Sequence, residues 1–302
     1  MGGAVSSLPW PSPIAVFESE WRSRLIRRRI ITAITLLIVS SLVFWAFSIS
    51  GIIAAAGNGQ ASANIADFLA RMNPQLQADQ LFEDQSTAGS IANWFNRWPI
   101  WRDLMIETIE IAYVSLVLST VLGLLAAILS ASTTNPIAPV RWVVRRLLEI
   151  IRTVPDLILA IILVTAFGFG PLAGILTLTL SGVGTLGRFF GEALENIDER
   201  PREAMRAVGA SHAKQVRFGI LPQVMPLFVS FIFLRLETSI SSATTLGLVG
   251  AGGIGTELIR AMDFNQYQTY FALLLLILAV IVISDILSET VRHRMAITEG
   301  VL

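Results

Sequence analysis

Long stretches without charge alternate with short arginine-rich segments along the chain. A bilayer core about 30 Å thick is crossed by roughly 20 apolar helical residues, so each long stretch is a candidate membrane span. The pattern predicts an all-α integral membrane protein with six transmembrane helices, over approximately residues 30–50, 111–130, 150–167, 172–190, 223–245 and 267–286.

The arginines predict which segments face the cytoplasm, because basic residues accumulate on that side. Five arginines lie within residues 22–29, ahead of the first span, and others flank the uncharged run 157–187 on both sides. A run with both flanks inside must cross twice, and we place the return at the turn Gly168–Pro171. Six spans with cytoplasmic N- and C-termini satisfy every basic cluster. The first apolar run exceeds a typical signal-peptide core, so an uncleaved helix is the preferred reading.

The spans divide the chain into a plan with five parts. These are a cytoplasmic tail (1–29), a first transmembrane helix (30–50), an external segment (51–104), a core transmembrane domain (105–290) that includes a cytoplasmic coupling loop (198–222), and a cytoplasmic tail (291–302). No P-loop pattern occurs, so transport driven by ATP would need an ATPase on another chain.

Composition narrows the function classes. The chain has 302 residues, 54% of them hydrophobic, and a mean hydropathy of +0.67, which is typical of an integral membrane protein. Its net charge is zero, so nothing indicates nucleic acid as a partner. With no cysteine and two distant histidines, His212 and His293, no metal site, cofactor site or catalytic set converges. We therefore expect a protein that is not an enzyme and holds no cofactor itself.

The segment Asp198–Pro222 is polar and basic, yet apolar runs lie on both sides of it. Pro201 suits the first turn of a helix, and Glu203 then lies near the positive end of that helix. Gly209 is a natural stop, and Ser211 can cap a second short helix that ends before Pro222. The sequence predicts a helix, a bend and a helix at the membrane surface, which indicates a docking element.

Two charges lie within the fifth predicted span, where a charge costs free energy unless it is paired or hydrated. These are Arg235 and Glu237, which do not face each other because they are two residues apart on a helix. Pathway and structural roles both remain open for Glu237. If the substrate is an anion, Arg235 is the better ligand, assisted by backbone amides.

A glycine-rich stretch and an aromatic cluster can each be interpreted as a ligand site or as a structural feature. Gly252 and Gly253 belong to a stretch, 250–255, that formally matches GxGxxG, but a membrane helix precedes it instead of a strand, so we reject a dinucleotide site. Flexible backbone at a pathway mouth or a tight turn fits better. The external segment ends in Trp94, Phe95, Trp98 and Trp101, which we interpret as an interfacial aromatic belt, with an aromatic-ligand site as the alternative.

The coupling loop carries a family resemblance through Glu203, Ala204, Gly209, Leu221 and Pro222. Their spacing resembles the cytoplasmic motif of permease subunits in binding-protein-dependent ABC importers. Two positions depart from that motif, since Met205 replaces a second alanine and Gly219 stands where isoleucine is usual.

Further stretches resemble the phosphonate-type permeases, and together the resemblance covers about residues 105–290. The stretches are Arg152–Pro155, Gly168–Gly174, Gly184–Gly187, Glu192 with Glu195 and Asp198, and Leu246–Gly255. Ser181 stands where the subgroup would have histidine and Ser241 where it would have arginine, so two side chains that could attract an anion are replaced.

The resemblance implies a type I importer permease in the cytoplasmic membrane. It would work with a second permease copy, ABC ATPase subunits that hold ATP and Mg²⁺, and an external solute-binding protein. Phosphonate or a related phosphorus oxyanion is the expected substrate. Phosphite, a phosphate ester, an amino acid or a metal chelate are the rivals within the class. A self-contained secondary transporter or channel, and a membrane scaffold, are the rivals from other classes.

Overall fold

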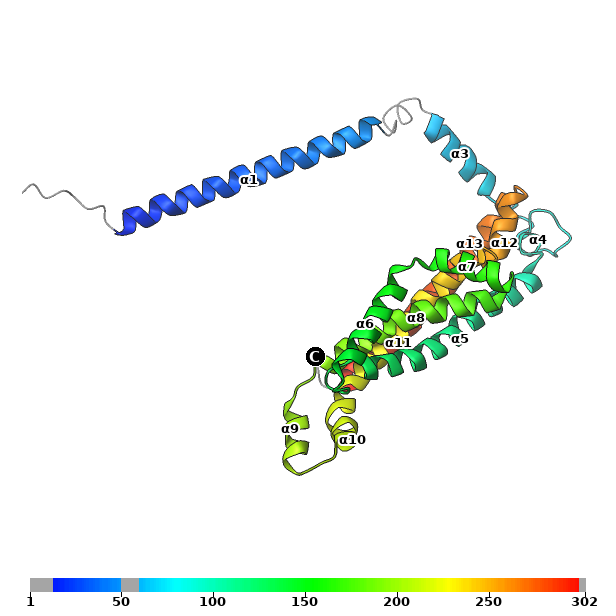
Figure 1. Ribbon diagram of the computed structural model, residues 1–302. Helices are drawn as coiled ribbons and strands as arrows, with labels where there is room; N and C mark the ends of the chain where they lie inside the picture. The colour runs from blue at the N-terminus through cyan, green and yellow to red at the C-terminus, as the bar shows by residue number, and fades with distance from the viewer. Residues whose placement is uncertain (1–12, 50–59, 299–302) are drawn as a thin grey trace, which may run out of the picture. The chain divides into compact units, whose positions relative to one another are not determined.

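The computed structural model describes residues 13–49 and 60–298, and regular structure in these residues is helical throughout (Figure 1). The chain divides into two units, residues 1–70 and 71–302. The elements are α1 (Pro13–Ile49), α3 (Gln60–Met72), α4 (Ile91–Trp94), α5 (Trp98–Ser130), α6 (Ala138–Thr153), α7 (Asp156–Phe167), α8 (Pro171–Glu195), α9 (Arg200–Ala207), α10 (His212–Gln215), the π-helix η1 (Val216–Ile220), α11 (Leu221–Gly247), α12 (Ile254–Asp263) and α13 (Tyr267–Thr298).

The first unit contains α1 and most of α3. The predicted N-terminal tail is helical from Pro13 onward, because neither glycine nor proline interrupts the sequence between Pro13 and Ile49. Within α1, the stretch Arg27–Trp45 is long and apolar enough to cross a membrane. Residues 1–12 of the predicted tail and 50–59 of the predicted external segment lie outside the described residues.

The second unit is built around α5, α8 and α11, which pack against one another. Small residues let these helices approach closely, as is usual in membranes. A Cβ built on Gly123 of α5 would lie 3.1 Å from the backbone nitrogen of Gly187 on α8. Aromatic rings fill the space between α8 and α11, where Phe190 and Phe228 have ring centroids 4.4 Å apart.

Five described helical segments are long and apolar enough to span a membrane, namely 27–45, 98–130, 171–195, 212–247 and 267–290. The third predicted span, 150–167, is broken into α6 and α7, and α7 has only 12 residues. The cause is Pro155, which disfavours helical backbone at the residue before it, and Val154 is extended with φ −79° and ψ 121°. The count of six crossings stays a prediction.

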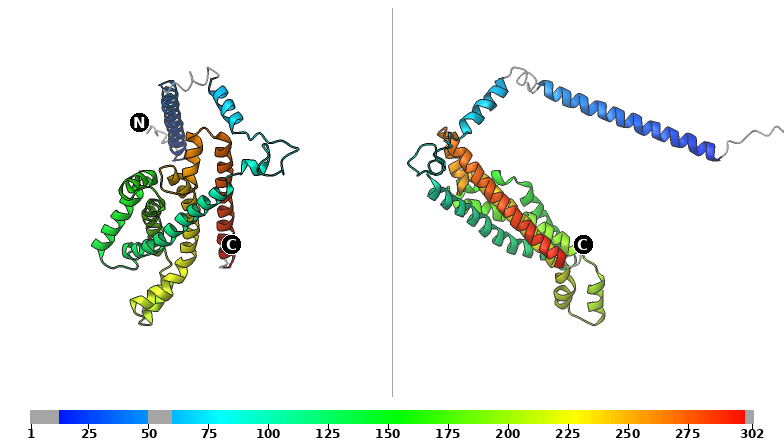
Figure 2. Two further views of the ribbon diagram at one scale, coloured as in Figure 1. Left: turned by 90° about the vertical axis from the view of Figure 1, so that its right-hand side faces the viewer. Right: turned by 180° about the vertical axis from the view of Figure 1, so that it is seen from behind.

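The turn at Gly168–Pro171 separates α7 from α8, as predicted. Gly168 has φ 89° and Gly170 has φ 137°, values that favour glycine. At the same end of this unit, the predicted glycine-rich loop before residue 265 proves to contain a helix, α12. The helices α9 and α10 project from the opposite end of this unit (Figure 2).

Candidate functional site: the projecting coupling segment and its base

The first helix of the predicted coupling loop forms as the sequence indicates. Pro201 lies in the first turn of α9, and Gly209 follows the end of α9 with φ +75°. The Gly209 N–H donates to the Arg206 carbonyl at 3.0 Å, and the Ala210 N–H donates to the Met205 carbonyl at 3.0 Å. These two bonds are the Schellman arrangement, which satisfies carbonyls at a helix end. The chain therefore turns sharply after α9.

The second helix differs from the prediction that it ends before Pro222. Ser211 is at the N-cap position of α10 without a side-chain capping bond, and α10 continues through η1 into α11. Proline lacks an N–H and its ring crowds the preceding turn, so a π-turn at this place accommodates Pro222 without ending the helix. Burial keeps this helix continuous, because Ile220 and Val224 are fully packed in the core.

The tip of the projecting segment exposes apolar and charged groups together. Glu203, Ala204 and Gly209 are exposed, and Val208 exposes 78% of its surface. Glu203 has no side-chain partner within the part of the chain that the structure describes. The projecting segment also exposes basic residues along its two legs, namely Arg200, Arg206, Lys214 and Arg217. An apolar point with charges around it can dock into a groove on another protein.

Met205, which follows Ala204 in α9, is half-buried, whereas Leu221 and Pro222 are exposed at the start of α11. The matched motif residues therefore lie in two places. Glu203, Ala204 and Gly209 are at the tip, and Leu221 with Pro222 is where the returning chain enters the helix bundle.

The two legs of the coupling segment are joined at their base. The side-chain oxygen of Gln223 accepts a bond from the Asp198 N–H at 3.1 Å, and its amide nitrogen donates to the Asp198 carbonyl at 3.2 Å. The same amide donates to the Gly219 carbonyl. Gly219 also explains a departure from the family motif, because a Cβ there would lie 3.2 Å from the Arg202 Cα. Glycine lets α9 lie directly on η1.

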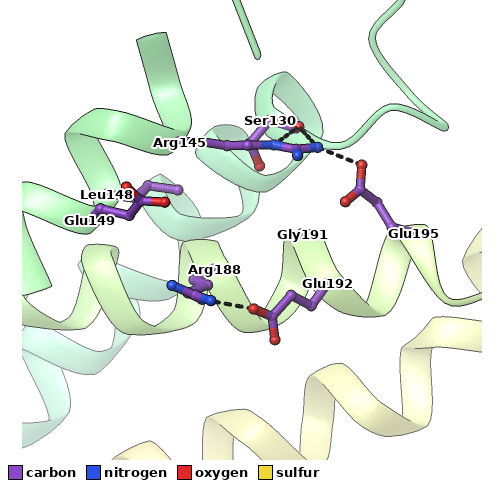
Figure 3. A pocket seen from close by; sticks show the side chains of 8 residues that line it. All are labelled: Ser130, Arg145, Leu148, Glu149, Arg188, Gly191, Glu192 and Glu195. Carbon is purple, nitrogen blue, oxygen red and sulfur yellow. Dashed lines mark hydrogen bonds and ion pairs between the residues drawn. The ribbon is translucent and has the colours of Figure 1, made fainter. Parts of the chain in front are cut away.

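Beside this base, α5, α6 and α8 surround a hollow of about 200 Å³ (Figure 3). Charged side chains dominate its lining, which consists of Ser130, Arg145, Leu148, Glu149, Arg188, Gly191, Glu192 and Glu195. Two ion pairs border it, Arg145 with Glu195 at 2.6 Å and Arg188 with Glu192 at 2.7 Å. The motifs in the sequence did not predict either ion pair as part of a functional site. Glu192 and Glu195 entered only through the family resemblance, since sequence spacing does not reveal a contact across 50 residues.

The mid-helix candidates separate into a buried and a more exposed group. Arg235 of α11 is 9% exposed, and its Nη2 donates to the Leu178 carbonyl at 3.2 Å and to the Ser181 hydroxyl at 3.3 Å. The structure thus brings Arg235 and Ser181 together. Glu237 is half-buried and Ser241 is exposed on the same helix.

The glycine candidates lie at the other end of the second unit. Gly252 and Gly253 have φ 89° and 77° and are buried. A Cβ on Gly253 would lie 2.4 Å from the Thr108 hydroxyl of α5, so the turn is packed against protein. The helix α11 precedes this turn, as expected, and a strand of the kind that a dinucleotide site requires does not.

The aromatic cluster differs from the predicted belt. Trp101 is fully buried, and Trp94 stacks on Phe271 of α13 with centroids 6.0 Å apart. Phe95 meets Trp101 edge-on at 5.9 Å, and of the four residues only Trp98 is exposed, at 44% of its surface. The rings therefore attach the segment before α5 to α13, because aromatic surface is buried where neighbouring helices offer a partner.

Comparison with known proteins supports the family resemblance that the coupling segment carries. Residues 119–297 match the family of binding-protein-dependent transport system inner membrane components. The phosphite transport system permease protein PtxC of Stutzerimonas stutzeri is 40% identical over 200 residues, 66% of this chain and 73% of that protein. PhnE2 of Escherichia coli K12, named for a cryptic phosphonate transport system, is 41% identical over 119 residues, 39% of this chain and 98% of that protein.

The fold is shared with a solved transporter. A chain of the MetNI methionine ABC transporter, in inward-facing conformations, superposes with a TM-score of 0.59 and 23% identity, over 66% of this chain and 98% of that chain. The chain therefore belongs to the inner membrane components of binding-protein-dependent transport systems, as a multi-pass ABC importer permease of the phosphonate-type subgroup in the cytoplasmic membrane.

Proposed function

We propose that this permease carries phosphonate or a related phosphorus oxyanion, such as phosphite, into the cell, driven by ATP hydrolysis on a separate subunit. The carrying observation is the projecting α9–α10 segment, which exposes Glu203, Ala204 and Gly209 at the motif spacing. Phosphite and phosphonate occur in the names of the relatives described above, and both are phosphorus oxyanions.

The working unit we propose is a pair of permeases on a pair of ATPases, with an external binding protein that delivers the solute. The tip of α9 enters a groove on the ATPase, where Val208 meets apolar surface and Glu203 meets a basic group. Closure of the ATPases on ATP then rotates the permease halves as rigid bodies and switches access from one side to the other.

Within the membrane, we propose that Arg235 attracts the anion. It is a buried cation at the middle of α11, and its Nε has no hydrogen-bond partner among the described atoms. A cation held at this depth is costly unless it has a function or a partner. Ser181, which already accepts a bond from Arg235, supplies a hydroxyl beside it. Specificity for one oxyanion would reside mostly in the binding protein.

The first experiment is extraction from native membranes in mild detergent, followed by identification of the copurified proteins. We expect a P-loop ATPase and an external binding protein. The complex is then placed in liposomes with ATP inside, and uptake of labelled phosphite, methylphosphonate and methionine is compared. Uptake of methionine but of neither phosphorus compound would contradict the proposed phosphorus oxyanion substrate. Recovery of a lone chain whose uptake needs no ATP would favour a secondary transporter.

A further inference from the structure

One carboxylate oxygen at the end of α8 collects three hydrogen bonds from the segment that follows α5. Glu195 Oε1 accepts from the Ser132 N–H at 2.7 Å, from the Ser132 hydroxyl at 2.7 Å and from Arg145 Nη2 at 2.6 Å. Hydrogen bonds to an ionised group are about twice as strong as neutral ones. Glu195 is 29% exposed at its side chain, so water competes only in part.

The donors on this oxygen are themselves fixed. Arg145 of α6 donates from Nε and Nη2 to the Ser130 carbonyl, at 3.0 and 2.8 Å, at the last turn of α5. Beside it, the Thr133 hydroxyl donates to the Leu194 carbonyl at 2.8 Å. The end of α5, the turn after it, α6 and the end of α8 therefore meet at Glu195 (Figure 3).

The hollow beside this contact makes the bonds to Glu195 more important for holding α6 against α8. Its volume of about 200 Å³ lies between α6 and α8, so close packing is missing there. The neighbouring ion pair Arg188–Glu192 lies within α8, and Arg188 reaches α6 only through the longer-range charge of Glu149. Among the interactions found in residues 60–298, the direct ion pair from α8 to α6 at this end of the unit is made by Glu195, which also holds the α5–α6 turn.

The position of Glu195 relates the contact to coupling. It is the last residue of α8, and α9 begins five residues later at Arg200. A force on α9 reaches α8 through this short link. A helix passes a displacement to its neighbours only through packing or bonds, and the hollow removes part of the packing.

We infer that Glu195 is a positioning residue for energy coupling, which fastens α5 and α6 to the end of α8 so that they move with α9. The inference rests on the proposed ATP-driven function. It assigns a role to a residue that lies outside the docking motif.

The test uses the whole complex in liposomes and measures solute taken up per ATP hydrolysed. Glu195→Ala removes all three bonds, whereas Glu195→Gln keeps the accepting oxygen. We expect Glu195→Ala to lower uptake per ATP by about tenfold, within the usual range of coupling between sites, and Glu195→Gln to lower it less. The matched control is Glu192→Ala, one turn away in α8, which loses only its own-helix pair and should keep the ratio of the unchanged protein.

A second measurement separates a mechanical role from a folding defect. The chain has no cysteine, so Ser132→Cys with Glu195→Cys places the only two thiols of the chain across the contact. A short bifunctional thiol reagent should restore uptake per ATP in this double variant, whereas a reagent with one reactive end should not. This arm remains decisive even if Glu195→Ala fails to assemble with the ATPase.

The outcomes are distinguishable from failure of the proposed function. If the unchanged complex hydrolyses ATP without taking up a phosphorus oxyanion, the proposed substrate is wrong, and the ratio is measured with the solute that the binding protein retains. If Glu195→Ala couples as well as Glu192→Ala, or if the cross-link leaves a defective ratio unchanged, the positioning role is wrong.

Discussion

The backbone of Arg202 in α9 lies directly against Gly219 of η1, so close that any side chain at position 219 would push it away. A Cβ there would lie 3.2 Å from the Arg202 Cα and 3.4 Å from its nitrogen. The family motif usually has isoleucine at this position, so in this chain α9 is free to lie closer to η1 than a branched side chain would permit.

The first prediction concerns this contact. Gly219→Ile should push α9 away from η1 and destabilise the segment by about 1–3 kcal/mol, as overpacking does. The ATPase should then copurify in a smaller amount, and thermal unfolding in detergent should begin earlier. Ala213→Ile adds an isoleucine on the exposed α10 and serves as the control for thermal unfolding. Equal unfolding temperatures for the two variants would contradict the close contact between α9 and η1.

The second prediction concerns the tip. Gly209 has open space around it but φ +75°, so a side chain there meets backbone strain without a steric neighbour. We expect Gly209→Val to cost roughly 1–2 kcal/mol locally and to alter the turn after α9. Uptake should fall although the helices of the bundle remain folded.

Glu203→Lys tests the same tip through charge. Because Glu203 is exposed, the substitution should leave thermal stability unchanged and weaken docking to the ATPase. Substrate-stimulated ATP hydrolysis is the measurement for Glu203→Lys and for Gly209→Val. Normal stimulation in both would remove the coupling role from this segment.

The third prediction concerns Arg235. Arg235 bonds a carbonyl and a hydroxyl, so a methionine in its place removes the desolvation cost of a buried charge, and Arg235→Met should unfold at the same temperature or higher. If Arg235 attracts the anion, uptake should nevertheless fall by about tenfold, which corresponds to one lost charged contact. Arg235→Lys keeps the positive charge and should retain part of the uptake. A fall in stability together with uptake would instead assign Arg235 to holding α11 against α8.

The fourth prediction concerns a buried carboxylate at the opposite end of the same unit. Glu257 is 3% exposed and pairs with Arg97 at 2.6 Å and with Arg260 at 3.1 Å. Arg97→Met removes the shorter bond to a buried charge and should destabilise by about 2 kcal/mol. Glu257→Gln should cost less, because the two arginines left behind can reach water. Thermal unfolding of both variants checks this order, and a larger cost for Glu257→Gln would contradict it.

Much of the helical layout was predictable from local sequence. Long apolar runs became α5, α8, α11 and α13, because apolar helices are the stable way to bury backbone in a bilayer. The glycine turn at Gly168–Pro171 and the end of α9 at Gly209 also formed as expected, since both depend on the backbone freedom of glycine.

The departures have tertiary causes. The length of an apolar run does not reveal that Pro155 splits a span into α6 and α7. Pro222 reads as a helix end, yet the buried Ile220 and Val224 keep the helix continuous through a π-turn. The bonds on Glu195 join residues 50 and 63 positions apart, and no local pattern predicts such a contact.

The continuity of α10, η1 and α11 also has a mechanical meaning. From His212 to Gly247 the chain forms a rod of 36 residues, which at the rise of an α-helix is about 54 Å long. The π-turn at Val216–Ile220 is its natural fulcrum, with a short arm among the tip residues and a long arm of 27 residues in the bundle. A rigid-body rotation of about 10° about that turn would move the far end of the long arm by about 7 Å, so a small movement at the tip becomes a larger one at the opposite end of the unit.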